Sequence, residues 1–324
     1  MLEVGGGHYL KMPIEFTHPN KLLWPERGLT KADLLAYYEA AADRLLPHIA
    51  GRPLTLKRFN EGVGGEGFFQ KNAPASAPQS LARYETWTES SHRVVSYAVV
   101  DDLEGLRWCA QSNAIELHSW FSRVDLPERL DTCPFDLDPW SEDQDVYRAA
   151  LDLRAALSQL GLEALVKSSG KRGLHVYVPI ERAYEFSEVS AFALAVCRLV
   201  ASRQPNLYTV EMRKADRSGR LLLDWSRAGS AQTMVAAWSP RGTPNATVST
   251  PLSWDDVAAR IDVTSFTVPG VLERRDPWAD EPVAPQRLEP AFGALREAGM
   301  ELEAISPRAR TMAPRTRRRV DLDT

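Results

Sequence analysis

The chain has 324 residues, of which 44% are hydrophobic and 25% are charged, as in ordinary globular proteins. Its formal net charge of −4 excludes a strongly basic protein, so any nucleic-acid site has to be a local patch. The three cysteines, Cys109, Cys133 and Cys197, offer neither a disulfide framework nor paired zinc-ligand spacing, which favours a reducing cytoplasm. We find no apolar run long enough to span a membrane and no signal peptide, so we expect no membrane partner.

The first predicted helix covers residues 29–49. Thr30 is the expected N-cap because Asp33 follows three residues later, the spacing of a capping box. Apolar residues then recur at helical spacing, and Pro47 is expected to end the helix.

The later elements follow without strict alternation of helix and strand. In chain order we expect strands over 52–59, 93–102 and 114–120, a helix over 145–161, strands over 163–167 and 174–180, a helix over 186–203, a strand over 219–225, and helices over 253–261 and 289–299. This order predicts an α+β fold, with a mixed or mostly antiparallel sheet flanked by helices. We expect one folded domain over 1–300 and a basic, proline-containing, mobile tail over 301–324.

The segment FDLDP holds two aspartates one residue apart. In a strand, Asp136 and Asp138 would point to one face while Phe135 and Leu137 point into the core. Two adjacent anions repel unless a cation, usually a divalent metal, lies between them. Asp224, which ends an apolar strand, could supply the third carboxylate of a two-metal phosphoryl-transfer site. Spacing alone leaves the alternative open that these aspartates belong to a solvated loop and a turn.

Several other segments have the composition of a nucleotide site. The loop SSGKRG, residues 168–173, combines hydroxyls, glycines and cations as a phosphate cradle would, although it lacks P-loop spacing. His118 and the basic segment 211–220 could also contact phosphates. Phe68 and Phe69 stand on a glycine-rich loop, where aromatics can stack on unpaired bases. The alternatives are a hairpin turn, a structural histidine, a solvated charged loop and a core plug made by the two phenylalanines.

Taken together, six segments resemble one family, the polymerase domain of bacterial ligase D, which belongs to the archaeo-eukaryotic primase superfamily. They are GFFQKN, AIELHSW, FDLDP, SSGKRGLHVYVP, GRLLLDW and STPLSWDDV, and they occur in the order seen in the family. The resemblance runs from about residue 18 to residue 282, and six ordered motifs are far more specific than any one of them. It implies a primase-polymerase fold and template-dependent nucleotidyl transfer by a two-metal mechanism. In the family this reaction fills short gaps or acts at double-strand breaks in non-homologous end joining, often with a preference for ribonucleotides.

The resemblance also implies roles for individual residues. The catalytic, metal-binding carboxylates would be Asp136, Asp138 and Asp224, with Mn²⁺ or Mg²⁺ as cofactor. Positions that contact the nucleotide in the family are occupied here by Lys57, His118, Ser169, Arg172, Arg217 and Arg241. Lys21 and Lys31 match the pair that binds the 5′ phosphate of the downstream strand. Phe69, together with Phe68, falls where the family stacks an aromatic against the template.

The chain departs from the family pattern at two positions. His18 stands where the family often has Asn, which puts 5′-phosphate recognition in doubt. Arg227 is followed by Ala228 where the family commonly has polar residues, which leaves local nucleotide contacts open.

The expected partners follow from the same resemblance. They are DNA with gaps or ends that carry a 5′ phosphate, nucleoside or deoxynucleoside triphosphates, a separate DNA ligase and an end-binding protein, in the bacterial cytoplasm at the nucleoid. A separate ligase is expected because the sequence holds no K-x-D-G ligase motif, as in a free-standing member. Two alternatives stay open: a primer-independent primase-polymerase, and a catalytically silent DNA-binding module that recruits a ligase. A two-metal nuclease is a weaker alternative.

Overall fold

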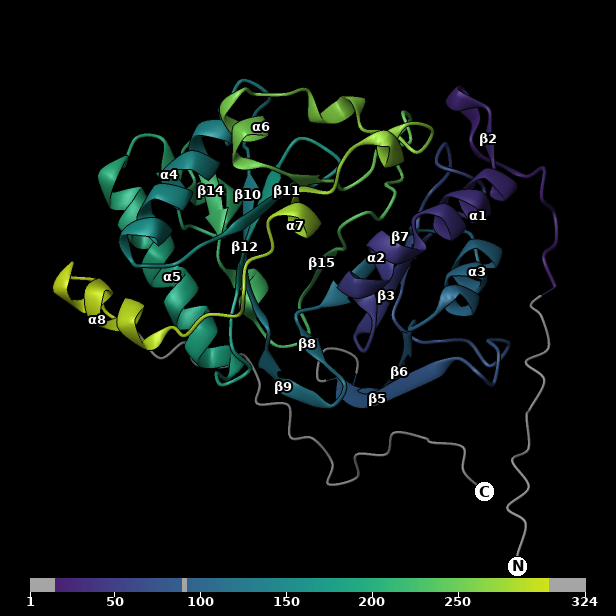
Figure 1. Cartoon of the computed structure of the whole chain (residues 1–324), viewed down its shortest axis with the longest axis horizontal. Helices are drawn as coiled ribbons and strands as arrows, with labels where there is room; N and C mark the ends of the chain where they lie inside the picture. The colour runs from purple at the N-terminus through teal and green to yellow at the C-terminus, as the bar shows by residue number, and fades with distance from the viewer. Residues whose placement is uncertain (1–14, 89–91, 303–324) are drawn as a thin grey trace, which may run out of the picture.

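The structure is a computed structural model that describes residues 15–88 and 92–302. Two six-stranded sheets dominate this part of the chain and lie next to each other (Figure 1). The first sheet runs in the order β15 (Thr233–Val235), β7 (Ala114–Trp120), β3 (Pro53–Arg58), β6 (Arg93–Val99) and β5 (Ala82–Thr88), with β4 (Phe68–Gln70) paired to β3. All of its strand pairs are antiparallel.

The second sheet is built around β10 (Thr132–Asp138), the strand that carries the D-x-D pair. Its order is β13 (Tyr208–Thr209), β14 (Leu221–Asp224), β10, β12 (Leu174–Pro179), β11 (Leu165–Ser168) and β16 (Pro251–Leu252). Its pairs are antiparallel except β13 with β14, so the sheet is mixed, as the sequence predicts. Two small ribbons pair β1 (Leu22–Trp24) with β2 (Leu29–Thr30) and β8 (Ser122–Arg123) with β9 (Leu126–Leu130).

Helices flank both sheets, which confirms the predicted α+β class. Figure 1 shows α1 (Lys31–Ala40), α2 (Ala42–Ile49) and α3 (Leu103–Gln111) beside the first sheet. Beside the second sheet lie α4 (Val146–Gln159) and the largely buried α5 (Phe186–Arg203). The chain then forms the shorter helices α6 (Trp254–Ala258), α7 (Pro277–Asp280) and α8 (Glu289–Glu297). No helix in the described ranges is both long and apolar enough to cross a bilayer.

The predicted helix ends depend on local signals, and these signals appear in the structure. Thr30 and Asp33 form a capping box at the start of α1, and Ser253 and Asp256 form another at the start of α6. Gly161 follows α4 with a φ of 75°, the left-handed conformation that glycine adopts at low cost. These helices therefore begin and end where side-chain hydrogen bonds and glycine geometry require.

The single helix predicted over 29–49 is wrong in two respects. The chain forms two helices that meet at Ala41, and Pro47 lies inside α2 instead of ending the first helix. Leu45 and Ile49 on either side of Pro47 are fully buried, and their packing holds the last turn although proline cannot donate a backbone hydrogen bond. The sequence analysis also missed α3, a short helix with a glycine in its first turn.

Two sequence predictions concern residues near the chain end and the cysteines. Residues 303–324 lie outside the described residues, so the basic tail over 301–324 and the domain boundary near residue 300 stay predictions. The three cysteines are buried and free, in agreement with the absence of a disulfide framework.

Candidate active site

A row of polar side chains crosses the second sheet at Asp136. Asp136 on β10 lies opposite Asp224 on β14 and opposite His175 on β12, and His175 in turn lies opposite Lys167 on β11. Directly opposed residues of antiparallel strands project from the same face, so these four side chains share one face of the sheet. Phe135, like its neighbour Leu137, is fully buried, as the strand alternation predicts. The D-x-D segment is therefore a strand and not a solvated loop.

Arginines contact the carboxylates of Asp136, Asp138 and Asp224. The Nε atom of Arg227 lies 3.1 Å from Oδ2 of Asp224 and 3.6 Å from Oδ2 of Asp136. Nη1 of Arg217 donates to Oδ2 of Asp138 at 2.9 Å. In this arrangement each of the three predicted metal ligands has a cationic neighbour.

Asp136 has an unusual electrostatic environment. Burial raises the pKa of its carboxyl to about 6; Arg227 opposes the shift, while Asp224 and Asp138 add to it. A divalent cation bound by these oxygens would relieve the repulsion, and carboxylate oxygens are the ligands that Mg²⁺ and Mn²⁺ prefer. As they stand, no three His, Cys, Asp or Glu side chains in the described ranges are arranged to hold a metal ion. The metal-binding role of the aspartates therefore stays a prediction.

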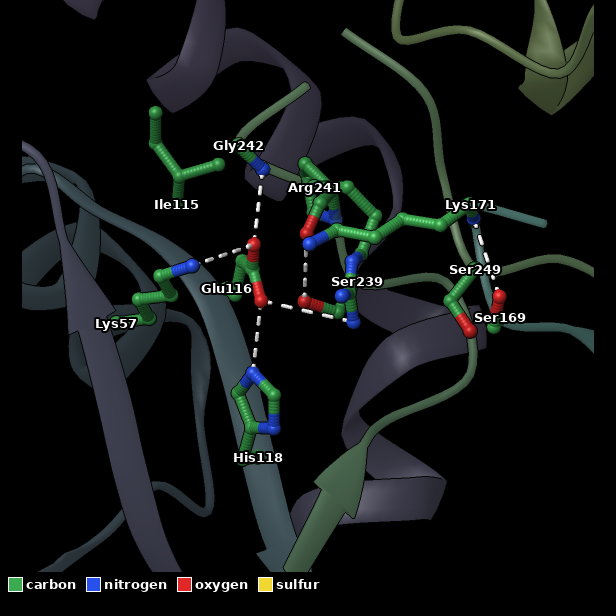
Figure 2. A network of polar contacts seen from close by, with 12 residues as sticks. Lys57, Ile115, Glu116, His118, Ser169, Lys171, Ser239, Arg241, Gly242 and Ser249 are labelled. Carbon is green, nitrogen blue, oxygen red and sulfur yellow. Dashed lines mark hydrogen bonds and ion pairs between the residues drawn. The ribbon is translucent and has the colours of Figure 1, made fainter. Parts of the chain in front are cut away.

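A second cluster forms around Glu116 on β7 (Figure 2). Oε2 of Glu116 lies 2.8 Å from Nε2 of His118 and 3.5 Å from Nη1 of Arg241. Oε1 accepts a hydrogen bond from the backbone N–H of Gly242 at 3.1 Å and lies 3.7 Å from Nζ of Lys57. Burial acts to raise the pKa of Glu116, but the hydrogen bond from His118 and the nearby positive charges lower it to about 2. Burial lowers the pKa of His118, although its contact with Glu116 opposes the shift. Glu116 is therefore a buried anion with two cationic neighbours, Lys57 and Arg241, and with the imidazole of His118 beside it.

One cavity of about 410 Å³ joins the two clusters. Seven of the predicted site residues line it: Phe69, His118, Asp136, Asp138, Ser169, Arg172 and Arg241. Three other predicted residues lie next to lining residues. Asp224 is paired with Asp136, and Arg217 donates a hydrogen bond to Asp138. Lys57 contacts Glu116, which in turn contacts His118. The fold thus brings together residues that are up to 184 positions apart in the sequence, from Lys57 to Arg241.

The predicted phosphate cradle lines the same cavity through Ser169, Lys171, Arg172 and Gly173. Oγ of Ser169 accepts hydrogen bonds from the backbone N–H groups of Lys171 and Gly173. Gly170 has a φ of 68°, and a Cβ atom there would lie 2.5 Å from Cγ of Arg241, so the loop requires glycine to pack this closely. Arg172 extends to the surface, where it pairs with Glu142 at 3.0 Å.

The two phenylalanines of the glycine-rich loop lie at the surface. Phe68 is 42% exposed and Phe69 is 57% exposed, so the alternative of a core plug is wrong. The ring of Phe69 contacts the ring of His118 edge-on, with 5.3 Å between the ring centres. A template-stacking role for these aromatics stays a prediction.

Lys21 and Lys31 lie apart from the cavity, in a separate hollow of about 390 Å³ that His18 and Asn113 also line. The side chain of Lys31 is 3% exposed, and its Nζ donates to the backbone oxygen of Thr17 and to Oε1 of Gln111. Burial lowers the pKa of Lys31, as does the positive charge of Lys21. The two lysines therefore form a compact cationic hollow of their own.

Comparisons with known proteins identify the family. The family model described as LigD, primase-polymerase domain, matches residues 30–281. The chain belongs to this family. It is 35% identical over 304 residues to the multifunctional non-homologous end joining protein LigD of Mycolicibacterium smegmatis, a match that covers 90% of this chain and 39% of that protein. It is 29% identical over 264 residues to the bifunctional non-homologous end joining protein LigD of Bacillus subtilis, covering 81% of this chain and 42% of that protein.

A solved structure agrees with this assignment. The polymerase domain from Mycobacterium tuberculosis ligase D in complex with DNA superposes with a TM-score of 0.73 and 32% sequence identity. The match covers 83% of this chain and 95% of that chain. The primase-polymerase fold predicted from the six motifs is thus confirmed, and the chain spans about two fifths of the length of the LigD relatives it matches.

Sequence reasoning missed several residues of the site. Arg227 was named only because Ala228, the residue after it, departs from the family pattern. It contacts two of the three aspartates, and its i, i+3 spacing from Asp224 was the available signal. Glu116 could be placed near His118 by strand alternation, but its other partners come from distant segments. Lys167 and His175, buried within apolar strands, gave only the signal of a polar residue where the core was expected.

Proposed function

We propose that the chain is a template-dependent nucleotidyltransferase that extends a 3′ end at a gap or break in DNA. The observation that carries this proposal is a cavity lined both by Asp136 and Asp138 of the acidic row, which also includes Asp224, and by His118 and Arg241 of the cluster around Glu116. A nucleotidyl-transfer site needs both, because anionic oxygens hold the metal ions while cations and N–H groups hold the triphosphate. The names of the relatives, which are non-homologous end joining proteins, and the DNA in the related solved structure support DNA as the second substrate.

Asp136, Asp138 and Asp224 would hold Mn²⁺ or Mg²⁺. When bound, such ions lower the pKa of the attacking 3′ hydroxyl and neutralise charge on the leaving pyrophosphate. The raised pKa of Asp136 fits this role, because burial and the neighbouring Asp224 and Asp138 disfavour its charge and a bound cation would relieve this. Arg217 and Arg227 would hold the carboxylates in place until the cation arrives.

The other wall of the cavity would bind the nucleotide. Its proposed ligands for the triphosphate are Lys57, His118, Ser169, Arg172 and Arg241, and Arg217 would reach the triphosphate from beside Asp138. Guanidinium and ammonium groups bind phosphate oxygens through charge-assisted hydrogen bonds, and the imidazole of His118 can donate a further hydrogen bond. Phe69, with Phe68 beside it, would stack on a template base at the mouth of the cavity. A preference for ribonucleotides is part of the proposal and follows from the family resemblance.

Lys21 and Lys31 would bind the 5′ phosphate of the downstream strand in their own hollow. A separate hollow suits this role, since the 5′ end across a gap is some distance from the growing 3′ end. His18 would contribute an imidazole in place of the asparagine common in the family. We further propose that a separate DNA ligase and an end-binding protein act with the chain at the bacterial nucleoid.

Primer extension on a gapped duplex with a 5′ phosphate tests the proposal. Mn²⁺ would be compared with Mg²⁺, ribonucleotides with deoxynucleotides, and the wild type with Asp136→Ala/Asp138→Ala. Asp255→Ala, which removes an exposed carboxylate on α6, serves as the matched control. We expect templated extension that the double substitution abolishes and the control retains.

Other results would favour other functions. No extension under any condition, with DNA binding retained, would overturn the polymerase proposal in favour of a recruiting module. Extension that begins without any primer would favour a primer-independent primase-polymerase instead. Metal-dependent strand loss without nucleotide would point to a nuclease.

A further inference from the structure

We propose that Glu116 is a positioning residue that keeps three hydrogen-bond-donating side chains gathered beside the cavity, ready for a triphosphate. The three side chains are Lys57, His118 and Arg241. This inference rests on the proposed function, in which these side chains bind the nucleotide. Neither the family motifs nor the comparisons assign a role to Glu116.

The position of Glu116 suits an indirect role. Its side chain is 1% exposed and does not line the cavity, whereas His118 and Arg241 do. Both carboxylate oxygens are used, Oε2 toward His118 and Arg241 and Oε1 toward Lys57 and Gly242 (Figure 2). Glu116 therefore acts through the residues it contacts.

The partners of Glu116 come from its own strand, from the strand paired with it and from a distant segment of the chain. Lys57 is on β3, His118 is on β7 and Arg241 is in the segment that follows β15. Cationic groups brought this close repel one another unless an anion lies between them. Glu116 is the anion that lies between them.

The backbone beside Arg241 is fixed by the same carboxylate. Gly242 donates its N–H to Oε1 of Glu116, and the neighbouring backbone groups of Arg241 bond to Thr247 and to the indole of Trp24. A Cβ atom at Gly242 would lie 2.0 Å from the ring of Phe59, so the chain approaches that ring as closely as only glycine allows. The guanidinium of Arg241 therefore projects from a backbone with little freedom to move.

Removing the charge of Glu116 has two opposed effects. It makes the cavity wall more positive, which favours an anionic ligand. It also leaves His118 and Arg241 without their anion, and their side chains are only 12% and 10% exposed, so water cannot replace it well. Binding of a triphosphate requires several donors at fixed positions. We therefore expect the loss of order to outweigh the gain in positive charge.

Titration with inorganic tripolyphosphate tests this inference without requiring any chemistry. We expect Glu116→Gln to weaken tripolyphosphate binding roughly tenfold or more, because a buried charged hydrogen-bond partner is lost. Glu116→Asp keeps the charge but shortens the side chain, and we expect an intermediate loss. The matched control is Glu104→Gln, which removes a carboxylate on α3 that pairs with Arg107; it should leave binding unchanged.

Steady-state extension separates positioning from a general loss of structure. Glu116→Gln should raise KM for the nucleotide by a similar factor while kcat at saturating nucleotide stays within about twofold of the wild type. Unchanged or tighter tripolyphosphate binding by Glu116→Gln would overturn the inference.

Two further outcomes are also decisive. If Glu116→Gln does not fold, binding by Glu116→Asp that equals that of the wild type overturns the inference. If the wild type itself does not bind tripolyphosphate, the proposed nucleotide site fails and the inference fails with it. If the wild type binds tripolyphosphate and Glu116→Gln binds it equally well, only the inference is overturned and the proposed nucleotide site stands.

Discussion

The carboxyl groups of Asp136, whose side chain is 21% exposed, and of the buried Glu116 lie beside one cavity, and their pKa values are shifted in opposite directions. The pKa of Asp136 rises to about 6 because burial and two neighbouring aspartates together exceed the effect of Arg227. The pKa of Glu116 falls to about 2 because His118, Arg241 and Lys57 together exceed the effect of burial. Burial is common to both groups, so the charges around each carboxyl decide the outcome.

This difference suggests a division of tasks between the two walls. The acidic row around Asp136 has less positive charge than it needs, so it favours an added cation. The cluster around Glu116 already has more cations than its single carboxylate balances, so it favours an added anion. A nucleotide with its metal ions supplies both.

The largest expected effect is a loss of activity on removing a carboxylate of the acidic row. Asp136→Asn should lower the rate of templated extension by at least about a thousandfold, since metal ions contribute several kcal/mol of transition-state stabilisation. The measurement is extension of a gapped duplex at saturating Mn²⁺, with Asp255→Asn as the control. Retention of more than about a tenth of the wild-type rate would contradict the assignment of Asp136.

The pH dependence of the free energy of unfolding tests the opposite pKa shifts of Asp136 and Glu116. The ordinary pKa of Asp136 is 3.8 and its folded value is about 6, so its contribution to stability is present below pH 3.8 and is lost as the pH rises to 6. At pH 7 its charge opposes folding, and Asp136→Asn should raise the free energy of unfolding by about 1 to 3 kcal/mol.

Glu116 should behave in the opposite way. Its ordinary pKa is 4.5 and its folded value is about 2, so its contribution is present above pH 4.5 and is lost as the pH falls through 2. At pH 7, Glu116→Gln should therefore lower the free energy of unfolding by about 2 to 3 kcal/mol. Urea denaturation of both variants between pH 4 and pH 7 measures these effects, and shifts of the same sign would contradict the electrostatic account.

An intermediate effect concerns the aromatic residue beside the cationic cluster. Phe69→Ala should reduce extension of a primed template roughly tenfold, because stacking on a base contributes about 1 to 3 kcal/mol. Val94→Ala, which shortens another exposed apolar side chain, on β6, is the matched control. If the two variants extend the template equally well, Phe69 has no template role.

The smallest expected effect concerns Lys21, which lies in the separate hollow and outside both walls of the cavity. Lys21→Gln should lower the preference for a 5′-phosphorylated gap about fivefold, since one charge-assisted contact is lost. The test compares extension on gaps with and without the phosphate, using the exposed Lys71→Gln as control. Lys21 suits this test better than Lys31, whose buried amine also bonds Thr17 and Gln111. If Lys21→Gln keeps the full preference for a 5′-phosphorylated gap, the hollow does not bind the 5′ phosphate.

The comparison also shows what sequence can predict here. The N-cap at Thr30 and the strand alternation of FDLDP depend on residues a few positions apart, and both were predicted correctly. The pairing of Asp136 with Asp224 depends on two strands far apart in the chain, so the residue pattern offered Asp224 only as one possible third carboxylate, and the family motifs added support. Pro47 was misplaced because tertiary packing overrode its local preference.

The environment of Glu116 was the least predictable part of the site. Strand alternation places it beside His118, but Lys57 and Arg241 reach it only through tertiary contacts. Its acidity depends on those contacts, since burial alone would shift its pKa in the other direction. Motif matching thus finds the residues at the cavity surface, and the structure is needed to find the carboxylate beneath them.

The most direct test of the account is a series of extension assays on a gapped duplex over a wide range of nucleotide concentrations. Wild type, Asp136→Asn and Glu116→Gln would be measured side by side with Mn²⁺. The account predicts that Asp136→Asn stays inactive at every concentration, while Glu116→Gln approaches the wild-type rate at saturating nucleotide. Recovery of Asp136→Asn at high nucleotide, or the same dependence on nucleotide in both variants, would contradict the division between a metal-binding wall and a triphosphate-binding wall.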